Sequence, residues 1–513
     1  MIETSNLGAL FDPDNGGDNI ALVDCSDWDH PTTMTHREID AAANACARGL
    51  LRRELKRGDA VALLSANRSE FLIGYLGILR AGLVAVPFNY KFAPDIMAFV
   101  LEDCGARHVL CDGPRRDLLA GDLPVTCFDD DGPDGFRNLL DYGPFEAVQP
   151  RDDEVAMVLY TSGSTGRPKG VPLTHKGHLW ALRKRMTVPS ASEHRLLVAA
   201  PLYHMNALCV SLFAHAAAAR EILLPEFDAV RYLEAIERFG CTWITSVPTM
   251  LAMCLAEREA LARSDLSSVR IVRMGSAPIS PKLWSQVKET FAGANIMNGY
   301  GTTEAGPIVF GPRSGHVVPD LSVGFPAAEV DIKLIDENGR EADQGVLWHR
   351  TPATMSAYLN LPEKTAQVLT EDGWYISGDV FRRDETEAYF FVGRADDMFV
   401  CGGENIYPGE VEALLVSHPA IVQACVVPVP DEIKGEKPVA FVVTEAGETL
   451  SEQSVKDYAL ATAPAYQHPR MVVFLDELPL AGPGKIDRNG LTIRARDLWV
   501  DGALASQSIS AGV

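Results

Sequence analysis

The sequence predicts an α/β fold: a large N-terminal body of stacked, mostly parallel sheets with flanking helices plus a β-rich subdomain, and a small mobile α+β C-terminal domain. Residues 35–111 and 195–300 alternate apolar strand patterns with helical patterns, which is typical of buried parallel sheets. After residue 322 the chain becomes β-rich and is punctuated by glycine and proline. A further strand and helix pattern beyond residues 394–396 predicts the small domain.

A capping box predicts the first helix. Thr35 stands three residues before Glu38, at the start of an alanine-rich stretch that continues to about Arg53. The strands that follow are apolar throughout, so both of their faces should be buried. In this first region we expect strands at 60–64, 83–87 and 107–111, and helices at 70–80 and 94–103.

The same alternation predicts the second region and the small domain. Between 195 and 300 we expect strands at 196–200, 221–224, 241–247, 269–274 and 294–298, and helices at 229–239, 249–262 and 281–291. Glu337-Asn338-Gly339 favours a hairpin between strands 330–336 and 345–350. In the small domain we expect helices at 409–417 and 451–463, strands at 421–428, 437–444 and 471–475, and a loose tail over 502–513.

Composition excludes several classes of protein. The chain has 513 residues, which suggests two to four structural units, and a formal net charge of −23. Such an acidic chain should not bind nucleic acid or an anionic membrane over a broad surface. No run of 18 apolar residues and no secretory leader is seen. Ten cysteines without a regular framework favour free thiols in the cytoplasm.

The most informative stretch runs from Tyr160 to Gly170, directly after an apolar strand at 155–159. Glycines let backbone N–H groups approach an anion, hydroxyl groups donate to phosphate oxygens, and Lys169 adds positive charge. This is not a Walker A loop, because glycine follows the lysine. A flexible linker is the alternative, but linkers seldom follow a core strand. The candidate polyphosphate-binding residues are Thr161, Ser162, Gly163, Ser164, Thr165, Gly166 and Lys169.

This loop resembles the signature loop of the adenylate-forming (ANL) superfamily, which includes acyl-CoA synthetases, luciferases and peptide-synthetase adenylation domains. The resemblance covers residues 30–490 and favours the AMP-forming acyl-CoA/aryl-CoA synthetase branch. It implies that ATP activates a carboxylate as acyl-AMP with release of pyrophosphate, and that the acyl group then passes to CoA. Six further motifs stand in the family's order and begin at Pro201, Asn298, Tyr375, Gly393, Cys401 and Gly484.

The resemblance also implies the ATP contacts. Tyr300 would stack on adenine, Thr303 would bond a phosphate and Glu304 would hold Mg²⁺. Asp379 would accept hydrogen bonds from the ribose hydroxyls, and Arg394 would contact ribose or phosphate. A tyrosine in the core and an aspartate in a turn are the structural alternatives. The other implied nucleotide-binding positions are Gly275, Ser276, Ala277, Pro278, Asn298, Gly299, Gly301 and Thr302.

Lys485 is the residue that the resemblance places between the attacking carboxylate and the α-phosphate, where an ammonium group neutralises developing charge. The small domain would then rotate about Asp396 for transfer to CoA and withdraw this lysine. In that orientation Gly402, Gly403 and Glu404 would line the pantetheine tunnel. The expected domains are a body over 1–393, a hinge over 394–396 and a mobile cap over 397–513.

The acyl substrate is less well indicated. By resemblance, His204 contacts the reacting carboxylate. The expected acyl pocket is mostly apolar, so a second carboxylate would lack a counter-charge, with Arg273 as the possible exception. An aromatic or medium-chain monocarboxylate is therefore expected, and Asn206 could bond a ring hydroxyl. The expected pocket residues are Met205, Asn206, Val247, Met250, Met274 and Ile308.

Two alternatives to a CoA ligase stay open. An acyl-AMP ligase would load a separate carrier protein, and CoA-dependent release of AMP distinguishes the two. A non-catalytic nucleotide-binding scaffold is disfavoured, because Lys169, Thr303, Glu304, Asp379 and Lys485 are all present. The substrates implied are ATP, coenzyme A and a small carboxylic acid, with Mg²⁺ as the metal. A homodimer is possible.

Overall fold

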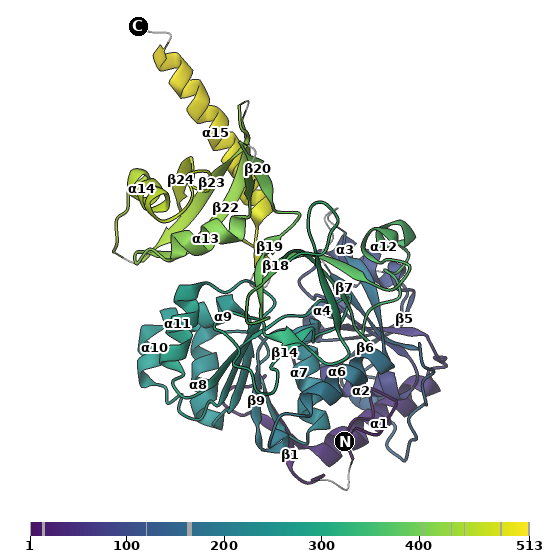
Figure 1. Cartoon of the computed structure of the whole chain (residues 1–513). Coiled ribbons are helices and arrows are strands. Elements are labelled where there is room, and N and C mark those ends of the chain that lie inside the picture. Colours follow the sequence, from purple (N-terminus) through teal and green to yellow (C-terminus); the bar gives the residue numbers. More distant parts are fainter. Residues whose placement is uncertain are drawn as a thin grey trace.

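The computed structural model describes residues 2–12, 16–119, 121–161, 167–402, 404–431, 433–445, 447–482 and 485–510, and for 481–482, 485 and 500–510 it describes the backbone alone. A large body carries a smaller unit, which lies above it in Figure 1 and is built on a sheet of its own. The body contains two large, mostly parallel sheets. The predicted α/β class is therefore confirmed.

The first large sheet has six strands in the order β6-β5-β3-β4-β7-β8. Neighbouring strands run parallel except for β7 and β8, which form an antiparallel pair at one edge. Four of these strands fall where the sequence predicts them, and β6 and β8 were not expected. The strands are β3 (Ala60–Leu64), β4 (Val84–Pro87), β5 (Ala106–Cys111), β6 (Val125–Cys127), β7 (Val155–Thr161) and β8 (Lys169–Thr174).

The second large sheet has seven strands in the order β13-β12-β11-β9-β10-β1-β2. Only the edge pair of β1 and β2 is antiparallel among these strands. The five strands predicted between residues 195 and 300 all belong to it. The strands are β1 (Ile20–Asp24), β2 (Thr32–Thr35), β9 (Arg195–Val198), β10 (Arg220–Leu223), β11 (Trp243–Ser246), β12 (Ile271–Gly275) and β13 (Asn295–Gly299).

Helices separate and cover the two sheets. In β3, Val61 and Leu63 point into the core between the sheets, whereas Ala62 and Leu64 point to the outer core. A strand buried on both faces must be apolar at every position, which explains its sequence. The inner helices are α1 (His36–Arg52), α2 (Ser69–Arg80), α6 (His175–Arg185) and α7 (Met205–Ala216); the outer ones are α3 (Pro94–Asp103) on one side and α8 (Ala229–Phe239), α9 (Pro248–Ala256), α10 (Arg258–Arg263) and α11 (Pro281–Thr290) on the other.

Local signals explain two helix boundaries. Thr35 accepts the backbone N–H of Glu38 at 3.2 Å and Glu38 accepts that of Thr35 at 2.7 Å, so the predicted capping box is confirmed. The single helix predicted over 249–262 is wrong. Glu257 leaves helical geometry with ψ of 66°, which divides the segment into α9 and α10. The strong helix formers on either side hid this break.

The β-rich region after residue 300 forms an antiparallel sheet in the order β16-β17-β18-β19. The predicted hairpin is confirmed, since β16 and β17 pair from Asp331–Arg350 to Ile335–Val346. The last strand of this sheet ends at Arg394, from which the chain continues to the cap. The elements of this region are β14 (Phe310–Gly311), β15 (Phe325–Pro326), β16 (Asp331–Ile335), β17 (Gln344–Arg350), α12 (Pro362–Val368), β18 (Tyr375–Arg383) and β19 (Tyr389–Arg394). Two short helices, α4 (Gly113–Arg116) and α5 (Phe136–Leu139), and a 3₁₀ turn (Ala191–Glu193) complete the body.

The C-terminal unit contains a five-stranded, mostly antiparallel sheet with helices packed against it. The loose tail predicted over 502–513 is wrong for residues 502–510, because α15 continues to Ser510 and projects from the cap in Figure 1. Residues 511–513 lie outside the described part. The elements are β20 (Phe399–Cys401), β21 (Glu404–Ile406), α13 (Pro408–Val416), β22 (Ile421–Asp431), β23 (Gly435–Thr444), α14 (Glu452–Thr462), β24 (Met471–Phe474), β25 (Leu480–Gly482), β26 (Lys485–Ile486) and α15 (Arg488–Ser510).

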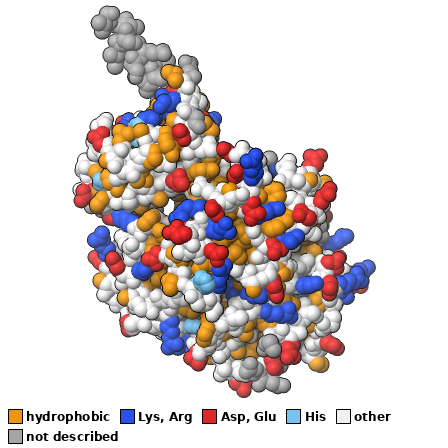
Figure 2. Space-filling view, in the orientation of Figure 1, with side chains coloured by type: hydrophobic (Ala, Val, Ile, Leu, Met, Phe, Trp, Pro, Cys, Tyr) orange, Lys and Arg blue, Asp and Glu red, His pale blue; other side chains and the backbone are white. Residues whose placement is uncertain are grey.

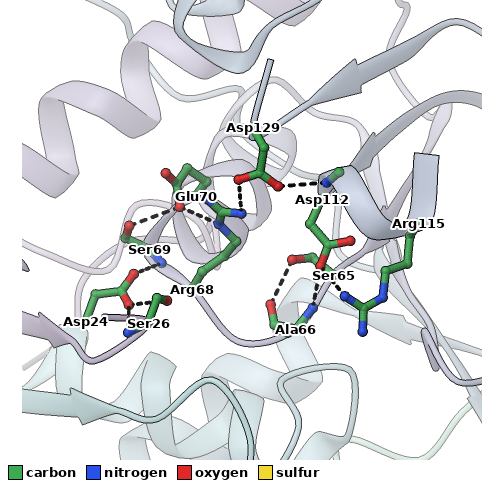
Figure 3. Close-up of polar contacts among 11 residues, drawn as sticks. Asp24, Ser26, Ser65, Ala66, Arg68, Ser69, Glu70, Asp112, Arg115 and Asp129 are labelled. Carbon is green, nitrogen blue, oxygen red and sulfur yellow. Dashed lines mark hydrogen bonds and ion pairs between the residues drawn. The ribbon is translucent and has the colours of Figure 1, made fainter. Parts of the chain in front are cut away.

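A polar junction links the two large sheets where their strands end (Figure 3). The backbone N–H of Ser69 donates to Asp24 at 2.7 Å, and Arg68 donates to Asp129 at 2.7 Å. Asn67, which precedes Arg68, donates to the carbonyl of Ala200 at 3.0 Å and accepts the N–H of Leu202 at 2.8 Å. The junction therefore fixes the backbone that leads to His204.

Body and cap also meet through Lys282 on α11. Its Nζ donates to the carbonyls of Pro419 and Ile421 at 3.1 and 3.0 Å and lies 3.6 Å from Glu445. Figure 2 shows acidic and basic side chains interspersed on the face drawn. All ten cysteines are free and nine of them are buried. No helix within the described residues is long and apolar enough to cross a bilayer.

Candidate active site

The topology places the ends of four parallel strands, β9, β11, β12 and β13, at one edge of the seven-stranded sheet, where α/β proteins bind ligands. Gly275 and Gly299 stand opposite each other at the ends of β12 and β13. A Cβ at Gly275 would lie 2.7 Å from the carbonyl oxygen of Gly299, so the strands can approach only with glycine there. Ser276 has a φ of +68°, a strained conformation for serine and one that is common at binding sites.

Tyr300, Asp379 and Arg394 form one cluster. The Tyr300 hydroxyl donates to Asp379, and Arg394 donates to the other carboxylate oxygen at 2.8 Å. Burial raises the pKa of Asp379, and the nearby Arg394 guanidinium opposes that rise. Phe381 packs edge-on against Tyr300 with ring centroids 4.9 Å apart. A partly exposed aromatic ring beside a carboxylate can hold a purine nucleoside.

Lys169, Tyr358 and Glu304 form a second cluster. Lys169 Nζ donates to the Tyr358 hydroxyl at 3.3 Å and lies 4.4 Å from its ring centre. The same hydroxyl donates to Glu304 at 2.8 Å. Burial lowers the pKa of Lys169, partly offset by Glu304. Tyr358 was not predicted, because it stands outside every motif and only the fold brings it between two motif residues.

The phosphate-loop segment is a hairpin between β7 and β8, in which Thr161 pairs with Lys169. The Thr161 hydroxyl is buried and has no hydrogen-bond partner among the described residues. A buried hydroxyl without a partner is costly and marks a place where a ligand oxygen could bind. Of the residues predicted for this loop, Ser162, Gly163, Ser164, Thr165 and Gly166 lie outside the described residues.

The remaining nucleotide positions surround these clusters. Asn298 donates to the carbonyl of Leu321 at 2.8 Å, which fixes the strand that leads to Tyr300. Thr302 accepts the backbone N–H of Ala305 at 3.1 Å, so it shapes the turn before Glu304 rather than offering its hydroxyl oxygen freely. Positions that are at least partly open to solvent are Ser276, Ala277, Pro278, Gly301 and Thr303.

On the acyl side, Arg273 donates to the Asn206 side-chain oxygen at 2.9 Å. Burial, together with the positive charge of Arg185, lowers the pKa of Arg273 to about 9, so it stays charged at neutral pH. The Asn206 amide nitrogen and Arg185 Nη1 are buried without a described partner. The charged guanidinium of Arg273 therefore stands beside Asn206, whose own amide nitrogen has no described partner.

The other expected pocket residues do not lie on the face that carries Arg273 and Asn206. His204 is exposed, precedes α7 and packs on Tyr203 with ring centroids 4.5 Å apart. Met274 alternates with Arg273 along β12 and its side chain is fully buried in the core beneath α8 and α9. The remaining members lie in different cores: Val247 and Met250 with Met274, Met205 between the sheets, and Ile308 against the Tyr300 cluster.

Several predicted residues belong to the cap. Gly402 has a φ of +65° in the turn between β20 and β21, and Glu404 is exposed. Asp396 is exposed and accepts a hydrogen bond from Arg394 at 3.2 Å, which links the hinge position to the nucleoside cluster. Gly403 lies outside the described residues, and Lys485 is described by its backbone alone, in β26.

Comparison with known proteins identifies the family. The profile described as "AMP-binding enzyme" matches residues 12–359, and that of "AMP-binding enzyme C-terminal domain" matches residues 410–485. The chain belongs to the AMP-binding enzyme family. Among its relatives in this family are a 4-coumarate–CoA ligase of Pinus taeda, 32% identical over 90% of each chain, and a feruloyl-CoA synthase of Amycolatopsis sp, 34% identical over 89% of this chain and 92% of that protein.

Solved structures of AMP-binding enzymes agree with this assignment. An anthranilate CoA ligase, AuaEII, in complex with anthranoyl-AMP has a TM-score of 0.88 and 27% identity, covering 96% of this chain and 98% of that one. ATP-bound MatB from Rhodopseudomonas palustris has a TM-score of 0.86 and 28% identity, covering 97% and 100%. The prediction of an AMP-forming acid–thiol ligase of the adenylate-forming superfamily is therefore confirmed.

Proposed function

We propose that the site joins an aromatic carboxylic acid to coenzyme A in two steps. In the first step a carboxylate oxygen attacks the α-phosphorus of ATP and pyrophosphate leaves. In the second, the CoA thiol loses its proton, its sulfur attacks the acyl carbon and AMP leaves. The observation that carries this proposal is the convergence of two clusters, one of Tyr300, Asp379 and Arg394 and one of Lys169, Tyr358 and Glu304. In addition to the effect of burial, Arg394 lies close enough to lower the pKa of Lys169, and Glu304 close enough to raise that of Asp379.

The residues divide the first step between them. Asp379 accepts hydrogen bonds from the ribose hydroxyls while Tyr300 covers the base. Lys169, the Thr161 hydroxyl and the loop between them neutralise the phosphates, which lets an anionic carboxylate approach a polyanion. Lys485 arrives from the cap and stabilises the charge that develops at the α-phosphate.

Mg²⁺ would be held by Glu304 together with the phosphates of the nucleotide. Three or more metal-binding side chains do not cluster anywhere in the described chain. A single buried carboxylate nevertheless fits, because Mg²⁺ commonly takes one or two protein carboxylates and completes its shell with substrate phosphates and water. When bound, the ion would screen the phosphate charge.

For the second step we propose a hinge at 394–396 that carries the cap, residues 397–513, between two orientations. Rotation would remove Lys485 and bring the turn of Gly402, Gly403 and Glu404 to the thiol entrance. The positive φ of Gly402 supports this role, since a glycine turn lets a thin chain pass close to the backbone. Buried free thiols support a reducing, cytoplasmic setting. Size-exclusion chromatography tests whether the chain forms a homodimer.

We further propose that the preferred acids carry an oxygen substituent on the ring. Arg273 supplies a positive charge beside Asn206, and the buried amide nitrogen of Asn206 lacks an acceptor among the described residues. A hydroxyl or methoxy oxygen beside the Arg273 guanidinium would satisfy that amide, whereas an unsubstituted ring would leave it buried and unpaired. The relatives that act on 4-coumarate and ferulate support this class of acid.

Release of AMP and pyrophosphate, followed over a panel of acids with ATP, Mg²⁺ and CoA, tests the substrate proposal. Wild type should prefer hydroxylated over unsubstituted aromatic acids by about tenfold, the value of one hydrogen bond to a charged group. Arg273→Gln should abolish most of that preference. An unchanged preference in the variant would refute the role of Arg273. Pyrophosphate release without any AMP release on addition of CoA would favour the carrier-loading alternative.

Lys485→Ala tests the mechanism. Pyrophosphate release in the first step should fall by about 10²-fold or more, because the lost group acts on the developing charge. Transfer to CoA from supplied acyl-AMP should stay within about threefold of wild type, since the lysine is absent from that step. Near-normal pyrophosphate release would refute the proposed role.

A further inference from the structure

One partly buried ion pair in the cap lies next to the predicted catalytic lysine. Arg488 begins α15, three residues after Lys485. Its Nη1 and Nη2 donate to the two carboxylate oxygens of Glu412, each at 2.7 Å, which is the bidentate geometry of a strong arginine–carboxylate pair. Arg488 Nη1 also donates to the carbonyl of Val426 at 3.2 Å, and Glu412 accepts the N–H of Val426 at 2.7 Å.

This pair joins segments next to three proposed functional features. Glu412 lies on α13, the helix that follows the turn of Gly402 and Glu404. Arg488 itself follows β26, which carries Lys485. Arg488 Nε also lies 4.0 Å from a carboxylate oxygen of Asp397, the residue after the hinge position.

The pair is more than a surface contact. The Glu412 side chain is 14% exposed and that of Arg488 is 30% exposed, and Arg488 packs against the buried Cys425 with 3.6 Å between Nη1 and Sγ. Exposed ion pairs contribute little to stability. A partly buried, bidentate ion pair also fixes the relative positions of its two side chains. A lysine in place of Arg488 would offer only a point charge and could not make the two parallel hydrogen bonds to the Glu412 carboxylate.

We propose that Arg488 is a positioning residue that sets the place of the Lys485 segment relative to the hinge. The inference rests on the proposed role of Lys485 in the first step. Helix α13 has its own anchors, because Val411 and Leu415 are fully buried in the cap core. The two residues of β26 pair only with β25 among the described strands, and Ile486 packs against a core of the cap. The Arg488 contacts add the link from this segment to α13 and Asp397.

The two half-reactions distinguish positioning from a general structural role. In Arg488→Ala, pyrophosphate release should fall by at least about tenfold, because a shift of about 1 Å in a reacting group can cost up to about a hundredfold. Transfer from supplied acyl-AMP should change by less than about threefold, since Lys485 is withdrawn there. Arg488→Lys keeps the charge but loses the bidentate geometry, so its rate of pyrophosphate release should lie between those of wild type and Arg488→Ala.

Matched variants complete the test. Glu412→Gln should reproduce the selective loss, and the double variant should be no worse than either single one. Arg496→Ala, an exposed arginine further along α15, should leave both steps unchanged. Equal losses in both steps, or no loss in the first, would overturn the inference. If instead Lys485→Ala keeps its first step, the proposed function fails, whatever Arg488 does.

Discussion

At the scale of single residues, the site depends on side chains that share one another's hydrogen bonds. Tyr358 contacts both Lys169 and Glu304, and Asp379 contacts both Tyr300 and Arg394. The sequence motifs predicted five of these six residues, but Tyr358 could be found only from the fold. Its role arises from the approach of two segments that lie 54 and 189 residues away in the chain.

Tyr358→Phe removes one hydroxyl and leaves the ring. The kcat/KM for ATP should fall by roughly 10- to 100-fold, because Lys169 and the buried Glu304 both lose a hydrogen bond to a charged group. Steady-state pyrophosphate release at varied ATP measures this. Tyr142→Phe, at a tyrosine that is 65% exposed, is the control. A wild-type value for Tyr358→Phe would show that the hydroxyl does not support the phosphate site.

At the scale of elements, the sequence predicts what local chemistry determines. The capping box and the apolar strands were predictable because they depend on neighbouring residues. The break at Glu257 and the helical residues 502–510 were not, because a weak local preference is decided by tertiary packing or by continuation from an existing helix. Edge strands such as β8 were missed because polar motif residues masked their pattern.

Thr35→Ala tests the cap of α1. The free energy of unfolding should fall by about 1 kcal/mol, since the backbone N–H of Glu38 loses its acceptor, the Thr35 hydroxyl. Denaturant titration followed by far-UV circular dichroism measures the change. Thr32→Ala, at an exposed residue of the neighbouring β2, should change stability by less than about 0.5 kcal/mol. Equal effects in both variants would contradict the capping argument.

At the scale of the whole molecule, buried histidines set the response to acid. Burial lowers the pKa of His36, His108, His175 and His178 to about 4 and that of His349 to about 3. Each histidine must therefore stay neutral in the fold. Its contribution to the free energy of unfolding is complete above a pH of about 6.5, the pKa of histidine in the unfolded chain. That contribution is lost as the pH falls from there toward the lower pKa of the folded protein. Glu221, whose pKa burial raises to about 7, acts in the opposite direction between about pH 4.5 and 7.

The unfolding free energy should therefore decrease below about pH 6.5. Each buried histidine contributes up to about 1.4 kcal/mol per pH unit in that range. Urea titrations at pH 7.5, 6.0 and 5.0 measure the slope, and His349→Gln should make it shallower by one such contribution. His30→Gln, at an exposed residue, is the control. A slope that His349→Gln leaves unchanged would contradict the argument.

The overall architecture was predictable, because repeated alternation of apolar strand patterns with helical patterns specifies a parallel sheet wherever it occurs. The relation of cap to body was not, since it depends on contacts between polar groups far apart in the chain, such as Lys282 and the carbonyls of Pro419 and Ile421. Local sequence carries no signal for a lysine that meets carbonyls 137 and 139 residues away.

That contact has a kinetic consequence. In the proposed two-orientation cycle, the cap would have to release Lys282 from its two carbonyls and from Glu445 and then recapture them. Hydrogen bonds from an ammonium group are worth about 1.5–3 kcal/mol, which corresponds to a ten- to hundredfold bias between two orientations. The Lys282 contacts would thus favour the orientation described here, without touching a substrate.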